Sequence, residues 1–483
     1  MFDYRTFALR KLTTLAPRYL PFADVASEQV PLGRLLRLSL FQVTVGMALV
    51  LLVGTLNRVM IVELNVPAGL VGTMLALPIV FAPFRALIGF KSDTHKSALG
   101  LRRIPYIWKG TLYQFGGFAI MPFALLVLSG YGEAIDAPMW IGHGAAALSF
   151  LLVGAGVHMV QTVGLALATD LVPEDDQPKV VGLMYVMLLV GMVVSALIYG
   201  VLLEDYSPGA LIQVIQGSAV VTVALNFLAM WKQEHRDRAR AQAMAAAPTI
   251  RFKDAWAQLM QGDGMGRLLT VIAVGTLGFG MADVLLEPYG GEVLGLSVAS
   301  TTKLTALLAC GTLFGFGYAS RNLGKGGSPT AMAVAGAAFG LPGFAAVIAS
   351  SFGFGTPLFL AGTLFIGLGA GLFGHATLTA TMRAAPKDKT GLALGAWGSV
   401  QATAAGVGMA LAGWLRDAIH ALPQDAGVSL HTPYLTVFSV EIVFLVLVVL
   451  LFLPLVGLRG QNQKPRADHA VSVQPNTTSV EVP

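Results

Sequence analysis

Two carboxylates lie inside a hydrophobic segment that is long enough to cross a lipid bilayer. Asp283 and Glu287 are four residues apart in the string GMADVLLEPYGGEVLG of residues 280–295, and this spacing places both on one helix face, one turn apart. Each would cost about 2.5–3.5 kcal/mol at the bilayer centre, so neither should face lipid. Pro288 removes a backbone donor, and the glycines at 290–291 allow other groups to approach closely. We therefore expect a helix that breaks beside two interior acids. The alternative is that Glu287 lies at the interface and Asp283 is a paired structural anchor.

The composition is that of an integral membrane protein. Of the 483 residues, 55% are hydrophobic and only 12% are charged, and the mean hydropathy is +0.71; soluble domains average about 25% charged residues. The 56 glycines suit close helix packing in lipid. A single cysteine, Cys310, excludes an intrachain disulfide and a thiolate metal cluster. The net charge of +5 gives no reason to expect a nucleic-acid partner.

Apolar runs and the polar stretches between them predict twelve membrane spans in two halves. Each run is near or above the ~20 residues needed to cross the hydrocarbon. The runs are 36–62, 68–90, 106–130, 139–169, 180–203, 209–231, 266–289, 298–320, 328–351, 356–383, 391–415 and 435–457. We expect an N-terminal arm (1–34), a first half (35–231), a linker (232–264), a second half (265–459) and a disordered tail (460–483).

Basic residues set the predicted orientation. With the N-terminus inside, all but four of the 31 Lys and Arg fall in or beside cytoplasmic segments; the exceptions are Arg58, Arg85, Lys303 and Arg416. This bias predicts that both termini and the linker are cytoplasmic.

The two halves resemble each other in sequence. The string that ends at Asp205 after the fifth span is echoed by the one that ends at Asp417 after the eleventh. Two six-span repeats joined by a cytoplasmic linker predict an all-α membrane protein with the major facilitator fold.

The loop after the second span carries a gating pattern typical of major facilitators. Gly89 and Asp93 are followed by the basic pair Arg102 and Arg103. An acid at a helix end can hold a neighbouring helix through charge pairing and helix-dipole contacts, and can release it when the halves rock. The corresponding place in the second half lacks the acid, so we expect gating to be asymmetric. Alternatively, this is a positive cytoplasmic loop with one incidental acid.

Three histidines fall inside predicted spans: His143, His158 and His375. A neutral imidazole can ligate a metal, including the magnesium of a chlorin. His158 and His375 lie fifteen and eleven residues before Pro173 and Pro386, which places them on similar faces of equivalent helices. Gln161 is a candidate hydrogen-bond partner of His158. Ordinary packing or hydrogen bonding is the competing interpretation for each histidine.

Other charges complete the intramembrane set: Arg58 and Glu63 in the first span, Arg85 in the second and Lys303 in the eighth. Pairing of Arg58 or Lys303 with Asp283 or Glu287 would neutralise both partners, so we expect at least one basic partner for the acids.

The remaining sequence features are Glu441, three pairs of glycines and the lack of catalytic motifs. Glu441 has no evident partner, and the G-x-x-x-G pairs at 311/315, 367/371 and 391/395 predict helix contacts. No nucleophile–base constellation or phosphate loop is present, so we do not expect an enzyme.

Four strings give the chain a family resemblance. They are LNRVMIVE (56–63), PFRALIGFKSDTH (83–95), RIPYIWKG (103–110) and DVLLEPYGG (283–291). Together they resemble the PucC/LhaA proteins of purple photosynthetic bacteria, over roughly residues 30–460. That family belongs to the bacteriochlorophyll-delivery branch of the major facilitators.

The resemblance implies an assembly factor for light-harvesting antenna complexes that hands bacteriochlorophyll to newly inserted antenna polypeptides. It implies bacteriochlorophyll a, and allows a carotenoid, as cofactor. The implied partners are antenna polypeptides, the reaction-centre core complex, bacteriochlorophyll synthase, the insertion machinery and the lipid bilayer. The implied location is the inner or intracytoplasmic photosynthetic membrane. Length and motifs favour the LhaA type, which serves the core antenna. The alternatives are a proton-coupled small-molecule transporter that uses Asp283 and Glu287, and a pigment-free scaffold.

Overall fold

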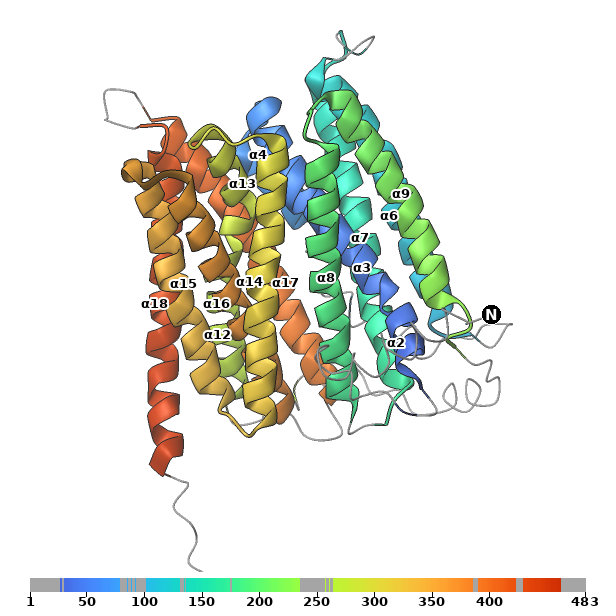
Figure 1. Cartoon of the computed structure of the whole chain (residues 1–483), viewed down its shortest axis with the longest axis vertical. Coiled ribbons are helices and arrows are strands. Elements are labelled where there is room, and N and C mark those ends of the chain that lie inside the picture. Colours follow the sequence, from blue (N-terminus) through green and yellow to red (C-terminus); the bar gives the residue numbers. More distant parts are fainter. Residues whose placement is uncertain are drawn as a thin grey trace, which may run out of the picture.

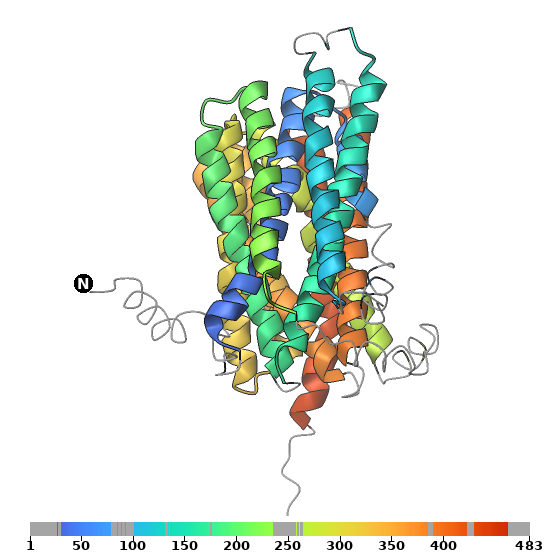
Figure 2. The same cartoon turned by 90° about the vertical axis from the view of Figure 1, so that its right-hand side faces the viewer.

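The chain folds into a bundle of long helices. The computed structural model describes residues 27, 30–78, 85, 88, 92, 101–130, 134, 136–173, 176–234, 257, 260, 264–384, 390–422 and 429–461. Every regular element within these ranges is a helix, and the helices run roughly along one common axis (Figure 2).

The first half comprises the elements before the linker. They are α2 (Leu32–Leu38), α3 (Leu40–Leu49), the π-helical turns η2 (Val50–Leu56) and η3 (Val59–Glu63), α4 (Ala68–Ala76), α6 (Ile104–Ser129), α7 (Met139–Asp170), α8 (Gln177–Leu202) and α9 (Pro208–Met230). The elements from α2 to η3 form one continuous span over Leu32–Glu63.

The second half comprises the elements after the linker. They are α12 (Met265–Gly280), α13 (Ala282–Glu292), α14 (Val298–Gly324), α15 (Pro329–Ala349), η7 (Ser350–Phe354), α16 (Gly355–Ala384), α17 (Thr390–His420) and α18 (Thr432–Gln461). Ser297 and Ser328 cap α14 and α15 by accepting hydrogen bonds from backbone N–H groups.

These bounds agree closely with the apolar runs of the sequence. Nine helical segments among the described residues are long and apolar enough to cross a membrane, and the segment Pro329–Ala384 contains both α15 and α16. The protein is therefore an all-helical, multi-pass membrane protein. Most of the second part of the predicted second span, from residue 79, lies outside the described residues, as do the arm at 1–26, much of the linker and the tail beyond 461.

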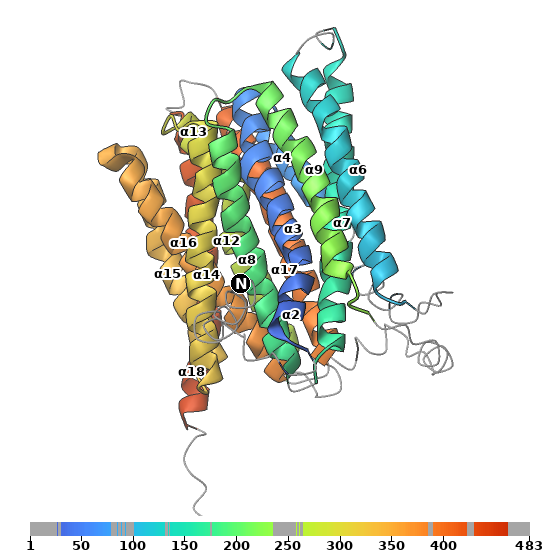
Figure 3. The same cartoon turned by 45° about the vertical axis from the view of Figure 1, so that its right-hand side comes forward.

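Two groups of helices lie side by side, and they correspond to the two halves of the sequence (Figure 1). Between them, α8 packs against α14 and α4 packs against α17; the first pair is also seen side by side in Figure 3. Figure 1 shows that α2 begins and α18 ends at the same face of the bundle. We call this the linker face, and the other end of the bundle the distal face.

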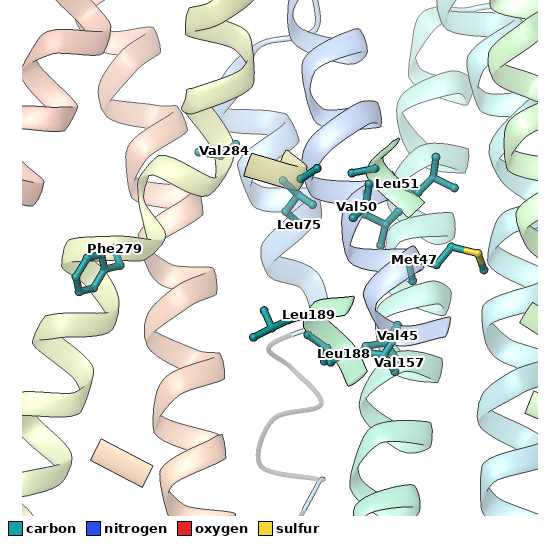
Figure 4. Close-up of a cluster of buried hydrophobic side chains, with 14 of the residues drawn as sticks. Val45, Met47, Val50, Leu51, Leu75, Val157, Leu188, Leu189, Phe279 and Val284 are labelled. Carbon is teal, nitrogen blue, oxygen red and sulfur yellow. The ribbon is translucent and has the colours of Figure 1, made fainter. Parts of the chain in front are cut away.

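Hydrophobic side chains from both halves form the core. Val45 of α3 lies close to Val157 of α7 and Leu188 of α8 in Figure 4, and Met47 of α3 belongs to the same core. Glycines bring other helices together. A Cβ at Gly311 would strike the backbone of α16 at Leu364, and Gly315, Gly367 and Gly371 are equally close to the opposing helix.

The α14–α16 contact confirms two of the three predicted G-x-x-x-G pairs. Gly395 has open space beside it, so the third pair makes no such contact there.

Candidate functional site

The segment with the two acids is broken, but the break lies before them. Helix α12 ends at Gly280 and α13 begins at Ala282, and the ribbon steps sideways between Phe279 and Val284 (Figure 4). Pro288 lies inside α13 without ending it. The expectation of a break beside the acids is confirmed, whereas its placement at Pro288 and the following glycines is wrong.

Side chains from two distant spans stabilise this broken helix. Pro288 has no N–H, so it leaves the carbonyl of Val284, four residues earlier, without its helical donor. The Asn57 side-chain amide donates to that carbonyl at 2.9 Å. At the start of α13, the carboxylate of Glu441 accepts from the Ala282 N–H. Glu441, which has no evident partner in the sequence, thus binds the first free donor of α13.

Glu287 and Asp283 are interior, and they differ in surroundings. Glu287 is 2% exposed, and one carboxylate oxygen accepts a hydrogen bond from the Thr305 hydroxyl at 2.9 Å. Its other oxygen is buried without a partner among the described residues. Asp283 is half-buried. Neither acid forms an ion pair within the described part of the chain, so the expected basic partner is not found there.

Arg58 instead pairs with Glu63 of its own span. Its guanidinium also donates to the Leu296 carbonyl at 3.2 Å and lies against Gly291, where a Cβ would come within 3.0 Å of it. This explains one of the predicted close approaches at the glycine pair. The expectation that Arg58 neutralises Asp283 or Glu287 is wrong.

Lys303 lies at the contact between the two halves. The methylene groups of its side chain cover Gly200 of α8. Lys303 therefore joins α8 and α14 through its apolar stem, and no ion pair of its ammonium group is found among the described residues.

At the distal face, Asp417 joins the halves. Its carboxylate accepts from the backbone N–H groups of Ala68 at 3.2 Å and Gly69 at 2.7 Å. These are the first donors of α4, which have no partner inside the helix, and the helix dipole favours an anion there. The preceding residue, Arg416, pairs with Glu292 of α13 at 2.8 Å.

Small residues bring α4 and α17 into close contact beside Asp417. A Cβ at Gly413 would strike the backbone oxygen of Ala68, and one at Gly72 would strike that of Met409. The Trp414 indole donates to the Thr73 hydroxyl at 3.0 Å. The two halves are thus tightly joined at the distal face.

The basic pair of the predicted gating loop binds within the first half. Arg103 forms an ion pair with Asp170 at the end of α7 at 3.0 Å, and Arg102 approaches the same carboxylate at 3.4 Å. Glu234 accepts from the backbone N–H groups that precede and begin α6. Gly89 and Asp93 lie outside the described residues, so the gating role stays a prediction.

The structure places His158 beside Arg85 and Gln161. The Arg85 guanidinium donates to the Gln161 side-chain oxygen at 3.0 Å and to the Thr162 hydroxyl at 3.0 Å. Gln161 thus binds Arg85, whereas the sequence suggested it as a partner of His158. The imidazole of His158 interacts electrostatically with Arg85, and its Nδ1 is buried without a hydrogen bond among the described residues.

Aromatic rings connect this group to His375 in the other half. Tyr185 of α8 lies near Arg85, and its ring centroid lies 6.3 Å from that of Phe316 and 6.2 Å from that of Trp397. Phe316 lies 4.2 Å from the His375 ring. The two predicted histidines are therefore connected by a chain of side chains across the halves, which we call the cross-half cluster.

His143 does not belong to this cluster. It lies near the start of α7, about 22 Å along the helix from His158 at 1.5 Å per residue. Sequence reasoning missed Tyr185, Phe316 and Trp397, because an aromatic residue within an apolar span carries no signal that separates packing from binding.

Comparison with known sequences covers nearly the whole chain. The sequence model of the family described as PUCC protein matches residues 55–460. Protein PucC of Rhodobacter capsulatus is 68% identical over 95% of this chain and 100% of that relative, and Protein PucC of Rhodovulum sulfidophilum is 64% identical over 88% and 94%. A more distant relative from Rhodobacter capsulatus, named Bacteriochlorophyll synthase 44.5 kDa chain, is 27% identical over 89% and 97%.

Solved transporter structures share the fold. A nucleoside transporter NupG structure has a TM-score of 0.66 at 13% identity and covers 87% of this chain and 99% of its own. A bacterial homologue of the iron transporter ferroportin in the inward-facing state has a TM-score of 0.61 at 18% identity, over 88% and 98%. These likenesses show a major-facilitator-like fold, and the matched sequences show that the chain belongs to the PucC family.

Proposed function

We propose that this protein is an assembly factor for light-harvesting antenna complexes, which binds bacteriochlorophyll and delivers it to newly inserted antenna polypeptides. Membership of the PucC family supports the link to photosynthetic complexes. The name of one relative refers to bacteriochlorophyll. Neither antenna class is favoured by the names reported above, so the preference for the core antenna stays a prediction.

The observation that carries the pigment part is the cross-half cluster. A chlorin is flat, aromatic and insoluble, and a neutral imidazole can bind its magnesium. The cluster offers His158 and His375 from different halves with aromatic rings between them. Aromatic faces are suitable surfaces for a conjugated ring. The imidazole of His158 or His375 would hold the magnesium of a bound chlorin through one ring nitrogen, and the aromatic rings would orient the macrocycle. His143, near the distal end of α7, is the reserve candidate for the ligand.

The tight distal contact indicates from which side pigment would reach the cluster. Counted along the helices at 1.5 Å per residue, His158, Tyr185, Phe316, His375 and Trp397 lie roughly 10–18 Å from the helix ends at the linker face. The halves are joined on the opposite side by Asp417. We propose twelve spans with the linker face in the cytoplasm, so that pigment reaches the cluster from the side on which it is made.

The partners and cofactors follow from the same proposal. Antenna polypeptides and the reaction-centre core complex would receive the pigment, and bacteriochlorophyll synthase and the insertion machinery would supply the pigment and the polypeptides. Bacteriochlorophyll a is the proposed cofactor, with a carotenoid as a second one. In this role the protein performs no covalent chemistry.

The absorption spectrum of the gently purified protein tests pigment binding. We expect a near-infrared band that is lost from the double variant His158→Phe, His375→Phe while protein abundance stays near normal, since phenylalanine retains bulk and removes the nitrogen lone pair. In a glycine variant at either position, added imidazole should restore the band. A double variant that retains its full pigment complement would move the ligand elsewhere, and His143 would be tested next.

A proton-coupled transporter is the second candidate, and one observation favours it. Glu287 is an interior carboxylate with an unpartnered oxygen among the described residues, and the fold is shared with transporters. Intramembrane acids of this kind form proton relays. A colourless purified protein that takes up a solute in response to a proton gradient, and loses uptake in Glu287→Gln, would support transport over pigment delivery.

A further inference from the structure

Arg85 is a cation whose described partners are all neutral. Its Nε and Nη2 groups donate to the Thr162 hydroxyl and the Gln161 amide oxygen. Within the described residues, no carboxylate forms an ion pair or hydrogen bond with it, and its Nη1 group has no partner there either. A guanidinium retains its charge under all ordinary conditions. An uncompensated charge inside a membrane protein is costly, and such residues mark functional sites.

Arg85 lies at a surface between the halves that is partly open. Arg85, His158, Gln161, Thr162 and Tyr185 all retain intermediate exposure, although the last four lie inside α7 and α8 rather than at their ends. Tyr185 faces the second half, because its ring contacts rings of α14 and α17. The accessible parts of these five side chains therefore belong to the inner surface of the bundle.

The chemistry of this surface favours one class of ligand. A guanidinium binds a carboxylate through two parallel hydrogen bonds, which are stronger than bonds to a neutral carbonyl. Aromatic and imidazole rings beside it suit a flat conjugated system. The site therefore matches a planar aromatic molecule that carries an acid group near one edge.

We propose that Arg85 selects a chlorin whose propionate side chain is a free acid over the corresponding ester. This inference rests on the proposed pigment function and deepens it. A chlorin has the free acid before its long-chain alcohol is attached and a neutral ester afterwards. The preferred ligand would then be the substrate of an esterification step, so the protein would hold the free acid alongside the esterifying enzyme and release the ester, which it binds less tightly, to antenna polypeptides.

Binding of two matched probes to the purified full-length protein tests this. The probes are zinc pheophorbide a with a free propionate and its methyl ester, and binding is followed by quenching of the protein's intrinsic fluorescence. Charge-assisted hydrogen bonds exceed neutral ones by enough to predict at least about tenfold tighter binding of the acid. In Arg85→Gln the acid should lose this advantage while the ester binds within about twofold of wild type.

Two further variants make the result specific. Arg85→Lys keeps the cation and should retain part of the preference, and Arg321→Gln removes an exposed arginine at the end of α14 and should change nothing. Equal binding of acid and ester by the wild type, or a preference that survives Arg85→Gln, would overturn the selection by Arg85 and leave pigment binding intact. Failure of both probes to bind the wild type would overturn the proposed function itself.

Discussion

Asn57 shows how a single polar residue compensates for a proline inside a buried helix. Its amide supplies the donor that Pro288 cannot, and it comes from a span 231 positions away in the sequence. It lies between the π-helical turns η2 and η3, and such turns are frequent at functional sites. The irregular part of the first span therefore holds the residue that stabilises the broken seventh span.

A double-mutant cycle tests this compensation. Asn57→Ala should cost about 1–3 kcal/mol of unfolding free energy, because the Val284 carbonyl loses its donor in a buried place. In a Pro288→Ala background the new N–H can bind the same carbonyl, so the cost of Asn57→Ala should fall. Unfolding in mixed detergent micelles measures both.

Asn226→Ala serves as the control for that cycle. Asn226 is buried and hydrogen-bonds Thr44 and Thr111 within the first half, so its cost should be the same in both backgrounds. If Asn57→Ala also costs the same with and without Pro288, the compensation does not operate.

At the scale of elements, the sequence predicts the helices better than it predicts their contacts. The apolar runs locate the spans because a bilayer needs about 20 apolar residues. Ser207 and Ser297 lie one residue before their helices and cap them. These signals are local, and they can be found without knowing any tertiary contact.

Contacts between distant spans could not be predicted, because they depend on how each helix is rotated and how deeply it is inserted. Glu441 and Ala282 are 159 positions apart, and nothing near Glu441 in the sequence points to a free N–H. Pro288 suggested a break, which the side-chain amide of Asn57 makes unnecessary by donating to the carbonyl that Pro288 leaves free. The pairing of Arg58 with Glu63 is local, because both residues lie in the first span. It could have been predicted if nearness in the sequence had been preferred to pairing with Asp283 or Glu287.

The capping of α4 by Asp417 can be tested by substitution. Asp417→Ala removes the acceptor for two N–H groups of α4, which should cost about 0.5–2 kcal/mol. The distal contact should then open more often, by roughly 2- to 30-fold. We expect correspondingly faster reaction of a cysteine placed at Leu70 with a membrane-impermeant maleimide, in a Cys310→Ser background.

Asp205→Ala is the matched control, because Asp205 lies shortly after the corresponding end of α8, at Leu202, and no hydrogen bond of its side chain is found among the described residues. It should leave the labelling rate of the Leu70 cysteine unchanged. Equal acceleration by both substitutions would mean that loss of surface charge, rather than loss of the helix cap, causes the effect.

At the scale of the whole molecule, the proposed orientation follows from the basic residues. The fold of the chain resembles that of a solved transporter, and α2 begins and α18 ends at the linker face (Figure 1). In sealed vesicles with the cytoplasmic side outward, protease should cut the linker at 232–264. Vesicles of the opposite orientation should protect the linker. If protease cuts the linker only in those vesicles, the twelve-span topology is contradicted.

The central claim is that the protein delivers pigment, and one transfer measurement addresses it most directly. Purified protein loaded with bacteriochlorophyll is mixed with liposomes that contain newly inserted antenna polypeptides, and the absorption spectrum is followed over time. The account predicts that the band of the protein-bound pigment declines while an antenna band rises, faster than with free pigment. It predicts that the variant His158→Phe, His375→Phe, supplied with equal total pigment, loses this acceleration. An antenna band that forms equally fast without the protein would contradict delivery.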